Sequence, residues 1–249
     1  MRFGLSILFG VLLVLSVGLQ AAPQRILFVG NSYLYYNDSL HNHVKRMVEV
    51  LQPELKGKLT YKSSTIGGAR LSHHPIDHLL AHENIGVAEP FEVVLLQGGS
   101  FETISDKNRR AFLATAKTFS DKIKKAGAKP VFYMTHDYVP PHRRADGDYT
   151  QVIAQTYAQA GKQNKALVIP VGLAFAESYK QRPELSLHMS FDGSHPNING
   201  TYLAACVVYL SLYGGTLAGL EYTYFGELDL ATAKYLQGIA QTVVGANHI

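Results

Sequence analysis

The sequence predicts an α/β fold in which helices cover both faces of a mainly parallel five-stranded sheet, as a three-layer sandwich. Short apolar runs alternate with segments of helical periodicity along most of the chain. Some of the short runs, such as Val93–Leu96, are apolar at consecutive positions, which is typical of parallel strands buried on both faces. A chain of 249 residues, of which 47% are hydrophobic, can bury one sizeable core.

The first residues are typical of a secretory signal peptide. Arg2 precedes an uncharged apolar run over residues 5–19, which two alanines and a proline follow. The run is short for a membrane span and no basic stop follows it, so no membrane anchor is expected after cleavage. We therefore expect residues 1–22 to be a signal peptide and residues 23–249 a single domain of a secreted or periplasmic protein, as from a bacterial exporter.

Cysteine content and charge give no sign of a disulfide-stabilised protein or of a nucleic-acid-binding protein. The only cysteine, Cys206, lies in the apolar pattern of a late helix, so an intramolecular disulfide is impossible. Export without disulfides is compatible with a bacterial periplasm or medium. The formal net charge is +4 and the basic residues form no long run, so the sequence has no nucleic-acid-binding signature.

In the N-terminal half, the predicted strands and helices alternate. Ile26–Val29 is an apolar strand that ends in Gly-Asn-Ser, and Ser39–Leu51 has apolar residues at helical spacing. Leu59–Ile66 is a second strand that ends in two glycines. Val93–Leu96 is a wholly apolar third strand that ends in Gln-Gly-Gly-Ser.

The C-terminal half continues the pattern. Asn108–Ala126 is a long helix, Pro130–Met134 a fourth strand, Tyr149–Asn164 a helix and Ala166–Ile169 a fifth strand. The most loop-like insertion, residues 140–148, is expected to lie over the carboxyl edge of the sheet as a substrate-contacting lid.

Polar and small residues follow the predicted strands, and ligands of open parallel sheets bind at this carboxyl edge. Ser32 follows the first strand at the mouth of a helix, where free backbone N–H groups and the positive end of the helix dipole suit a nucleophile. A Gly-Asn-Ser turn is also ordinary punctuation after a strand, so this turn alone does not identify a site.

A serine nucleophile needs a base, and the base needs a partner that fixes its tautomer. Asp192 lies three residues before His195 in a Gly-, Ser- and Pro-rich loop, from which both side chains can turn back over the sheet edge. Asp38 and His41 have the same spacing. There the predicted helix carries His41 away from Ser32, and Asp38 is expected to be the helix N-cap.

The Gly-Asn-Ser turn at Ser32 and the Asp192-x-x-His195 motif together resemble the SGNH (GDSL-type) hydrolase superfamily. The resemblance covers residues 26 to about 213 and implies a flavodoxin-like fold and a serine hydrolase acting on carboxylic ester bonds. By position it makes Ser32 the nucleophile, His195 the general base and Asp192 its orienter. It implies no metal and no organic cofactor.

The same resemblance implies an oxyanion hole built from the N–H of Ser32, a glycine of the second block and a side chain of the third. Gly68 is the better match for the glycine, and Gly67 is the alternative. Ser100 stands where the family has asparagine, and its hydroxyl can donate one hydrogen bond. Gln97 is the alternative donor if its side chain points toward the site.

Candidate substrate contacts are Tyr33, Gln97 and His136. Tyr33, together with Tyr35 and Tyr36, lies beside the nucleophile, where a tyrosine ring can stack on a sugar or pack in the core.

His74, His78 and His82 recur every four residues near Pro75, which suits a helix start. The outer two would lie ~12 Å apart on one helix and cannot share one ion. We expect a solvated stripe rather than a metal site.

These patterns favour a secreted serine esterase that acts on small acyl esters, with O-acetyl groups on carbohydrate ahead of lipid. The expected partner is a small-molecule or glycan ester, and neither nucleic acid nor a stable membrane anchor is expected. Two alternatives stay open: an acyltransferase that modifies an exported polysaccharide, and a non-catalytic glycan-binding protein on the same scaffold. The replacement of the family asparagine by Ser100 motivates the second alternative.

Overall fold

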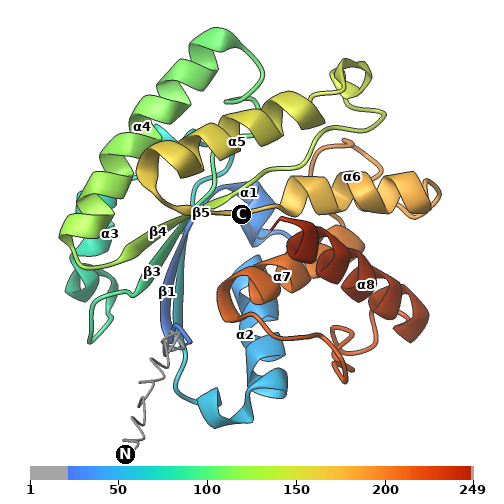
Figure 1. The fold of residues 1–249 in the computed structure, drawn as a ribbon, viewed down its shortest axis with the longest axis horizontal. Coiled ribbons are helices and arrows are strands. Elements are labelled where there is room, and N and C mark those ends of the chain that lie inside the picture. Colours follow the sequence, from blue (N-terminus) through green and yellow to red (C-terminus); the bar gives the residue numbers. More distant parts are fainter. Residues whose placement is uncertain (1–21, 248–249) are drawn as a thin grey trace, which may run out of the picture.

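Five parallel strands form one sheet in the order β2-β1-β3-β4-β5 in the computed structural model, which describes residues 22–247 (Figure 1). The chain adds β2 on one side of β1 and then β3, β4 and β5 on the other side, so the direction of winding reverses at β1. Ligands of doubly wound sheets bind at such a reversal. The sheet confirms the predicted fold class. All but one residue of the predicted signal peptide lie outside the described residues. The strands are β1 (Arg25–Gly30), β2 (Thr60–Thr65), β3 (Val93–Leu96), β4 (Lys129–Tyr133) and β5 (Leu167–Ile169).

Helices cover both faces of the sheet (Figure 1). Successive side chains of a strand point to opposite faces, so Ile26 and Phe28 of β1 pack with one helical layer and Leu27 and Val29 with the other. The first layer contains α2 (Leu40–Leu51), α6 (Val171–Gln181), α7 (Ile198–Tyr213) and α8 (Leu230–Ala246). The second contains α3 (Ile76–Leu80), α4 (Asp106–Lys125) and α5 (Thr150–Asn164).

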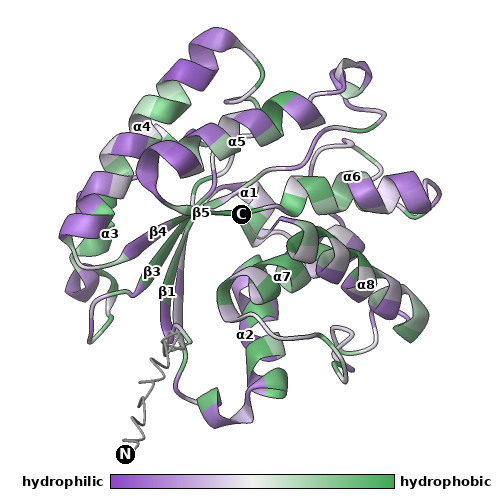
Figure 2. Ribbon diagram, viewed as in Figure 1, coloured by the Kyte–Doolittle hydropathy of each residue, from purple (hydrophilic) through white to green (hydrophobic). Residues whose placement is uncertain are grey.

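Hydropathy follows this layering. The central strands β1, β3 and β4 are mostly apolar, whereas the edge strand β2 is mostly polar and α4 and α5 carry many hydrophilic residues (Figure 2). Helix α7 is apolar on nearly all sides because it is enclosed by α2, α6 and α8, and its Cys206 is fully buried. No helix within residues 22–247 is long and apolar enough to cross a membrane.

The chain between β1 and α2 differs from the prediction. A four-residue helix, α1 (Ser32–Tyr35), precedes α2, and the three residues from Asn37 to Ser39 all have positive φ. Ser39, not Asp38, occupies the N-cap position of α2, so the predicted cap is wrong. The carboxylate of Asp38 instead pairs with Arg46 at 2.6 Å.

The predicted histidine stripe is also wrong. Helix α3 has only five residues and ends at Leu80, so His74 and His82 do not share a helix. His74 is 4% exposed, and burial lowers its pKa, whereas His78 is exposed. The residues that the structure describes contain no group of three or more side chains that could hold a metal ion. Four 3-10 turns complete the fold: Pro53–Leu55, Leu71–His73, His82–Ile85 and Ala145–Gly147.

Candidate active site

Ser32 is the first residue of α1, directly beyond the carboxyl end of β1. The side chain of Asn31 caps α1 by accepting a hydrogen bond from the N–H of Tyr33 at 3.1 Å. Gly30 leaves room for this turn, because a Cβ there would lie 2.3 Å from Oε1 of Gln97. The turn holds the Ser32 hydroxyl at the sheet edge, and it leaves the Ser32 N–H without a partner among residues 22–247.

A second loop, residues 188–196, folds back on itself between α6 and α7. The N–H of Met189 donates to the carbonyl of His195 at 2.8 Å, and the N–H of Gly193 donates to the carbonyl of Met189 at 2.9 Å. Gly193 has a φ of +61°, and a Cβ there would lie 1.9 Å from the carbonyl oxygen of Val139. Only glycine fits at this position, which brings the side chains on either side of it over the sheet edge.

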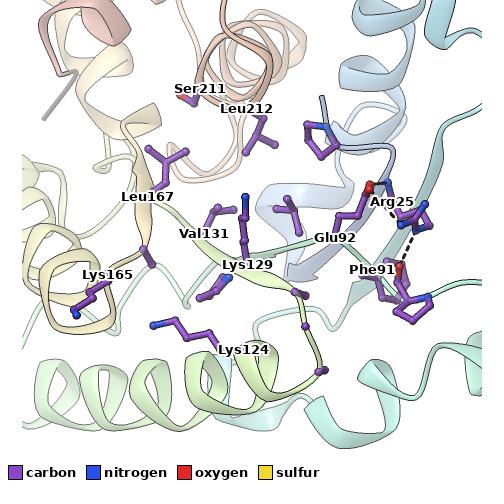
Figure 3. Close-up of a pocket in the computed structure, with 18 residues that line it drawn as sticks. Arg25, Phe91, Glu92, Lys124, Lys129, Val131, Lys165, Leu167, Ser211 and Leu212 are labelled. Atoms are coloured by element: carbon purple, nitrogen blue, oxygen red, sulfur yellow. Dashed lines mark hydrogen bonds and ion pairs between the residues drawn. The ribbon is translucent and has the colours of Figure 1, made fainter. Parts of the chain in front are cut away.

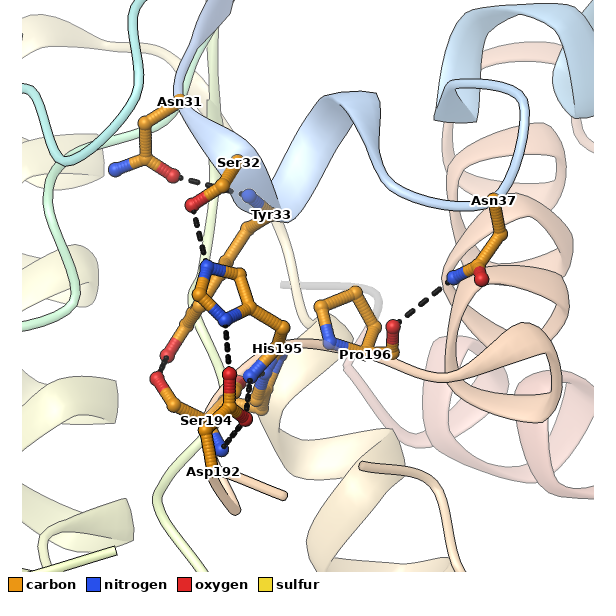
Figure 4. A network of polar contacts seen from close by, with 9 residues as sticks. Asn31, Ser32, Tyr33, Asn37, Asp192, Ser194, His195 and Pro196 are labelled. Carbon is orange, nitrogen blue, oxygen red and sulfur yellow. Dashed lines mark hydrogen bonds and ion pairs between the residues drawn. The ribbon is translucent and has the colours of Figure 1, made fainter. Parts of the chain in front are cut away.

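The two segments meet in a continuous relay of hydrogen bonds (Figure 4). Nε2 of His195 lies 2.8 Å from Oγ of Ser32, and Nδ1 of His195 lies 2.5 Å from Oδ2 of Asp192. Because Asp192 accepts from Nδ1–H, Nε2 is left to accept from the serine hydroxyl. The structure thus brings together the three residues that the motifs single out.

Asp192 is held as an acceptor on both of its oxygens. Oδ1 accepts from the backbone N–H groups of Ser194 and His195 at 2.8 and 3.0 Å. Partial burial by itself raises the pKa of Asp192, but the hydrogen bonds from the His195 side chain and from these two N–H groups outweigh it and lower the pKa. Asp192 therefore stays ionised and fixes the tautomer of the imidazole.

A hollow of about 360 Å³ opens beside this relay. Gly68, in the loop after β2, borders it with a φ of +66°, a conformation that favours glycine. The N–H of Gly68 has no hydrogen-bond partner among residues 22–247. Ser100, after β3, also borders the hollow, so the three predicted oxyanion-hole positions lie around one space. Its lining residues are Asn31, Ser32, Tyr33, Tyr35, Tyr36, Gly67, Gly68, Ser100, Phe101, Ser194 and His195.

Gln97 and His136 do not lie in this hollow, and both predicted substrate contacts are wrong. Gln97 is 1% exposed, and its Oε1 accepts from the N–H of Asn31 at 2.9 Å. His136 is 1% exposed, and its ring stacks between Tyr33 and Phe175 at centroid distances of 4.3 and 4.2 Å. Burial lowers the pKa of His136 far below its usual value. Both side chains are buried and hydrogen-bond to the backbone of the site, Gln97 at Asn31 and His136 at Ser194.

Tyr33 borders the hollow but is only 4% exposed, and its hydroxyl lies 2.8 Å from Oγ of Ser194. It offers a substrate little area for stacking. Tyr36 is the ring that lies against the site, since it stacks on His195 at 4.4 Å with an angle of 13°. Tyr35 is 41% exposed and stacks in turn on Tyr36.

Sequence reasoning missed Asn37, whose side chain joins the two loops of the site. Its Nδ2 donates to the carbonyl of Pro196 at 2.9 Å and to Oγ1 of Thr201 at 2.8 Å (Figure 4). Its carbonyl lies 2.6 Å from Nε2 of the buried His43. No local pattern announces these contacts, because the partners of the Asn37 side chain are about 160 positions away along the chain.

The predicted lid, residues 140–148, contributes no residue to the lining of the hollow. It follows Val139, whose N–H donates to the carbonyl of Gly193 at 2.9 Å. The segment before it therefore supports the loop that carries His195.

A larger cavity, of about 940 Å³, lies at the opposite edge of the sheet, where β1, β3, β4 and β5 begin (Figure 3). Arg25, Lys124, Lys129 and Lys165 lie around it, and Ser211 is the one serine among the described residues that line it. Within residues 22–247, no histidine that could serve as a base lines this cavity. The nucleophile–base pair is confined to the smaller hollow.

No protein-family model and no curated protein matches the sequence. Solved structures do match. A candidate SGNH hydrolase from Slackia heliotrinireducens has a TM-score of 0.58 and 25% identity, over 76% of this chain and 98% of that one. A DUF4886 family protein from Bacteroides uniformis has a TM-score of 0.67 and 17% identity, over 88% and 93% of the two chains.

An acetylxylan esterase from Geobacillus stearothermophilus, solved as a catalytic mutant, has a TM-score of 0.57 and 15% identity, over 77% of this chain and 95% of that one. The comparisons confirm the predicted fold superfamily, that of the SGNH (GDSL-type) hydrolases. The first of these structures, the candidate SGNH hydrolase, also supports the prediction that the chain is a hydrolase.

Proposed function

We propose that the protein is an exported serine esterase that hydrolyses small acyl esters, with O-acetyl groups on carbohydrate as its substrate class. One observation carries the proposal: Ser32, His195 and Asp192 form an unbroken relay at the carboxyl edge of the sheet. Export rests on the signal-like residues 1–22, and fractionation of expressing cells with N-terminal sequencing of the mature protein tests it.

In the proposed reaction, Oγ of Ser32 attacks the ester carbonyl while Nε2 of His195 takes its proton. Asp192 holds the imidazolium that forms. The negative charge on the former carbonyl oxygen is stabilised by the N–H groups of Ser32 and Gly68. The proton on His195 then passes to the departing alcohol, and a water activated by the same base releases the acid from Ser32.

Two features support a small acyl group on a sugar. The hollow is about 360 Å³, near the lower end of the range for ligand sites, which suits an acetyl group better than a long chain. The exposed Tyr35, stacked on Tyr36, offers a flat apolar face beside His195 on which a sugar ring can lie. Several of the structural neighbours are esterases that act on acetylated xylan or xylooligosaccharides.

A fluorophosphonate probe and ester hydrolysis test the proposal together. We expect the probe to label wild-type protein at Ser32 and p-nitrophenyl acetate to be hydrolysed faster than the octanoate. Ser32→Ala and His195→Ala should each abolish turnover, and Asp192→Asn should cost no more than His195→Ala. His41→Ala, at the second Asp-x-x-His motif, is the control and should be nearly silent. Turnover that survives His195→Ala but not His41→Ala would overturn the assignment.

The alternatives predict other outcomes. A non-catalytic glycan-binding protein would neither be labelled at Ser32 nor release acetate from acetylated xylan. An acyltransferase would move the acyl group to an added glycan in preference to water, which the partition of product between free acid and acylated glycan measures.

A further inference from the structure

Glu102 is a carboxylate buried next to the oxyanion hole, and the proposed chemistry does not use it. It lies two residues beyond Ser100 and is 1% exposed. Its Oε2 accepts two hydrogen bonds, from the N–H of Gly99 at 2.7 Å and from the N–H of Leu71 at 2.8 Å. A buried carboxylate is costly unless hydrogen bonds compensate it, so these two contacts are strong determinants of the local structure.

The two donors belong to different loops. Gly99 precedes Ser100 in the loop after β3, and Leu71 lies in the loop that carries Gly68 after β2. Both β2 and β3 pair with β1 and not with each other, so no ladder of the sheet joins these loops. The Oε2 atom of Glu102 bridges them across the end of β1.

Other contacts reinforce the same junction. Nδ2 of Asn31, beside the nucleophile, donates to the carbonyl of Ala69 at 3.2 Å. The guanidinium of Arg70 lies 4.5 Å from the ring centre of Phe101 and donates to Oδ1 of Asn108. Among these contacts, only Glu102 brings a charged acceptor to the backbone of both loops.

We propose that Glu102 is a positioning residue that fixes the separation of the loops carrying Gly68 and Ser100, so that both face the oxyanion of the transition state. The inference rests on the proposed esterase function. An oxyanion hole is effective only when its donors are already in place, because donors that must reorganise lose much of their benefit. Glu102 touches no substrate and acts through the two loops.

The geometry also says which property of Glu102 matters. Both N–H groups converge on one oxygen, so a single well-placed acceptor is sufficient and the second oxygen is not needed for the bridge. Glutamine can place its amide oxygen at the same point, whereas leucine offers no acceptor. Aspartate keeps the charge but withdraws the oxygen by one methylene.

The variants Glu102→Gln, Glu102→Asp and Glu102→Leu therefore separate position from charge. With p-nitrophenyl acetate, we expect Glu102→Gln to retain kcat within about threefold, and Glu102→Asp and Glu102→Leu to lose at least about tenfold with KM nearly unchanged. The Ki of a boronic acid that forms a tetrahedral adduct should rise in proportion to the loss in kcat/KM. Glu184→Leu, an exposed glutamate, serves as the matched control and should leave all three constants unchanged.

A loss of kcat in Glu102→Gln together with a retained kcat in Glu102→Asp would overturn the proposal. It would show that the negative charge of Glu102 matters and the position of its oxygen does not. If Glu102→Leu does not fold, the Gln and Asp variants still decide. If the wild-type protein hydrolyses esters and the Asp and Leu variants both retain its kcat, the positioning role of Glu102 is refuted and the proposed esterase function is not. A wild-type protein that neither hydrolyses esters nor reacts with a fluorophosphonate refutes the proposed function instead.

Discussion

The imidazole of His195 is enclosed by aromatic rings, and this arrangement makes a prediction at the scale of one residue. Tyr36 stacks on one face at 4.4 Å, and Tyr33 meets the ring edge-on at 5.9 Å. In the proposed reaction His195 takes the proton of Ser32 and becomes a cation, which the π face of Tyr36 stabilises. Tyr36 is therefore expected to favour the state in which the proton has moved from Ser32 to His195.

Tyr36→Leu should lower kcat/KM by about 2- to 30-fold, the effect of about 0.5–2 kcal/mol for a cation–π contact. Tyr36→Phe keeps the ring and should stay close to wild type. Steady-state kcat/KM on p-nitrophenyl acetate measures both variants. Equal losses in the Phe and Leu variants would mean that the hydroxyl, and not the ring, matters.

Ser100 makes a second prediction at this scale. If its hydroxyl donates to the oxyanion, Ser100→Ala should lower kcat by at least about tenfold with little change in KM. Ser100→Asn, which restores the residue of the resembled family, should retain or raise activity. Steady-state kinetics on p-nitrophenyl acetate decide, and an unchanged kcat in Ser100→Ala would mean that the hole consists of backbone N–H groups alone.

At the residue scale, the sequence predicts functional residues that lie in a short, recognisable motif. Ser32 follows a recognisable strand, and Asp192 and His195 lie within three positions of each other, so a motif can single them out. Glu102 and Asn37 escape it because their partners come from other loops. The prediction that Gln97 contacts substrate is wrong for a related reason. The sequence at a strand end does not reveal whether a side chain there points to solvent or into the sheet.

At the scale of elements, the loop that carries Asp192 and His195 depends on a glycine. Gly193→Ala would place a Cβ 1.9 Å from the carbonyl oxygen of Val139 and would also keep a φ of +61° that alanine disfavours. We expect the free energy of unfolding to fall by at least about 2 kcal/mol and kcat to fall sharply, because the loop must move to relieve the contact.

Gly127→Ala is the matched control for this change. Gly127 also has a positive φ, of +82°, but a Cβ there meets no atom within 4 Å. It should cost only about 1–2 kcal/mol for the left-handed conformation and leave kcat unchanged. Urea denaturation and kinetics on both variants give the comparison, and equal effects would show that the contact with Val139 is not decisive.

Periodicity predicted the long elements well and the junctions badly. The five strands and the helices α2, α4 and α5 lie within a few residues of their predicted positions. The reversal between α1 and α2 was not predicted, because three consecutive non-glycine residues adopt positive φ there. Asn and Asp tolerate this conformation as single residues, but a run of three is not expected from the sequence. Tertiary contacts hold it, among them those of Asn37 with Pro196 and Thr201.

At the scale of the whole molecule, buried histidines couple the fold to pH. His188 is 3% exposed, and burial lowers its pKa to about 4. Its Nδ1 accepts from the hydroxyl of Tyr179 at 2.7 Å, and its Nε2 donates to the carbonyl of Asp137 at 3.0 Å. The neutral ring therefore belongs to the folded state, while the unfolded chain takes up a proton near its ordinary value of 6.5.

Because the unfolded state binds more protons between pH 6.5 and about 4, stability should be full above 6.5 and should fall as the pH drops through this window. His188 alone contributes a loss of about 3 kcal/mol, from about 1.4 kcal/mol per pH unit. Urea denaturation from pH 4 to 7.5 measures it, and His188→Gln should flatten the slope. An unchanged slope in this variant would assign the acid sensitivity to other groups.

Because the side-chain amide of Asn37 donates hydrogen bonds to Pro196 and Thr201, the choice of expression host matters. Asn37, Asp38 and Ser39 form an Asn-x-Ser sequon, which the secretory pathway of a eukaryotic cell can glycosylate. A glycan on Nδ2 would occupy the nitrogen that donates to Pro196 and Thr201, next to the loop of His195. Protein secreted from yeast or mammalian cells is therefore expected to carry a disturbed His195 loop. Bacterial expression avoids the glycan, and so does Ser39→Gly, which abolishes the sequon and suits the φ of +64° at that position.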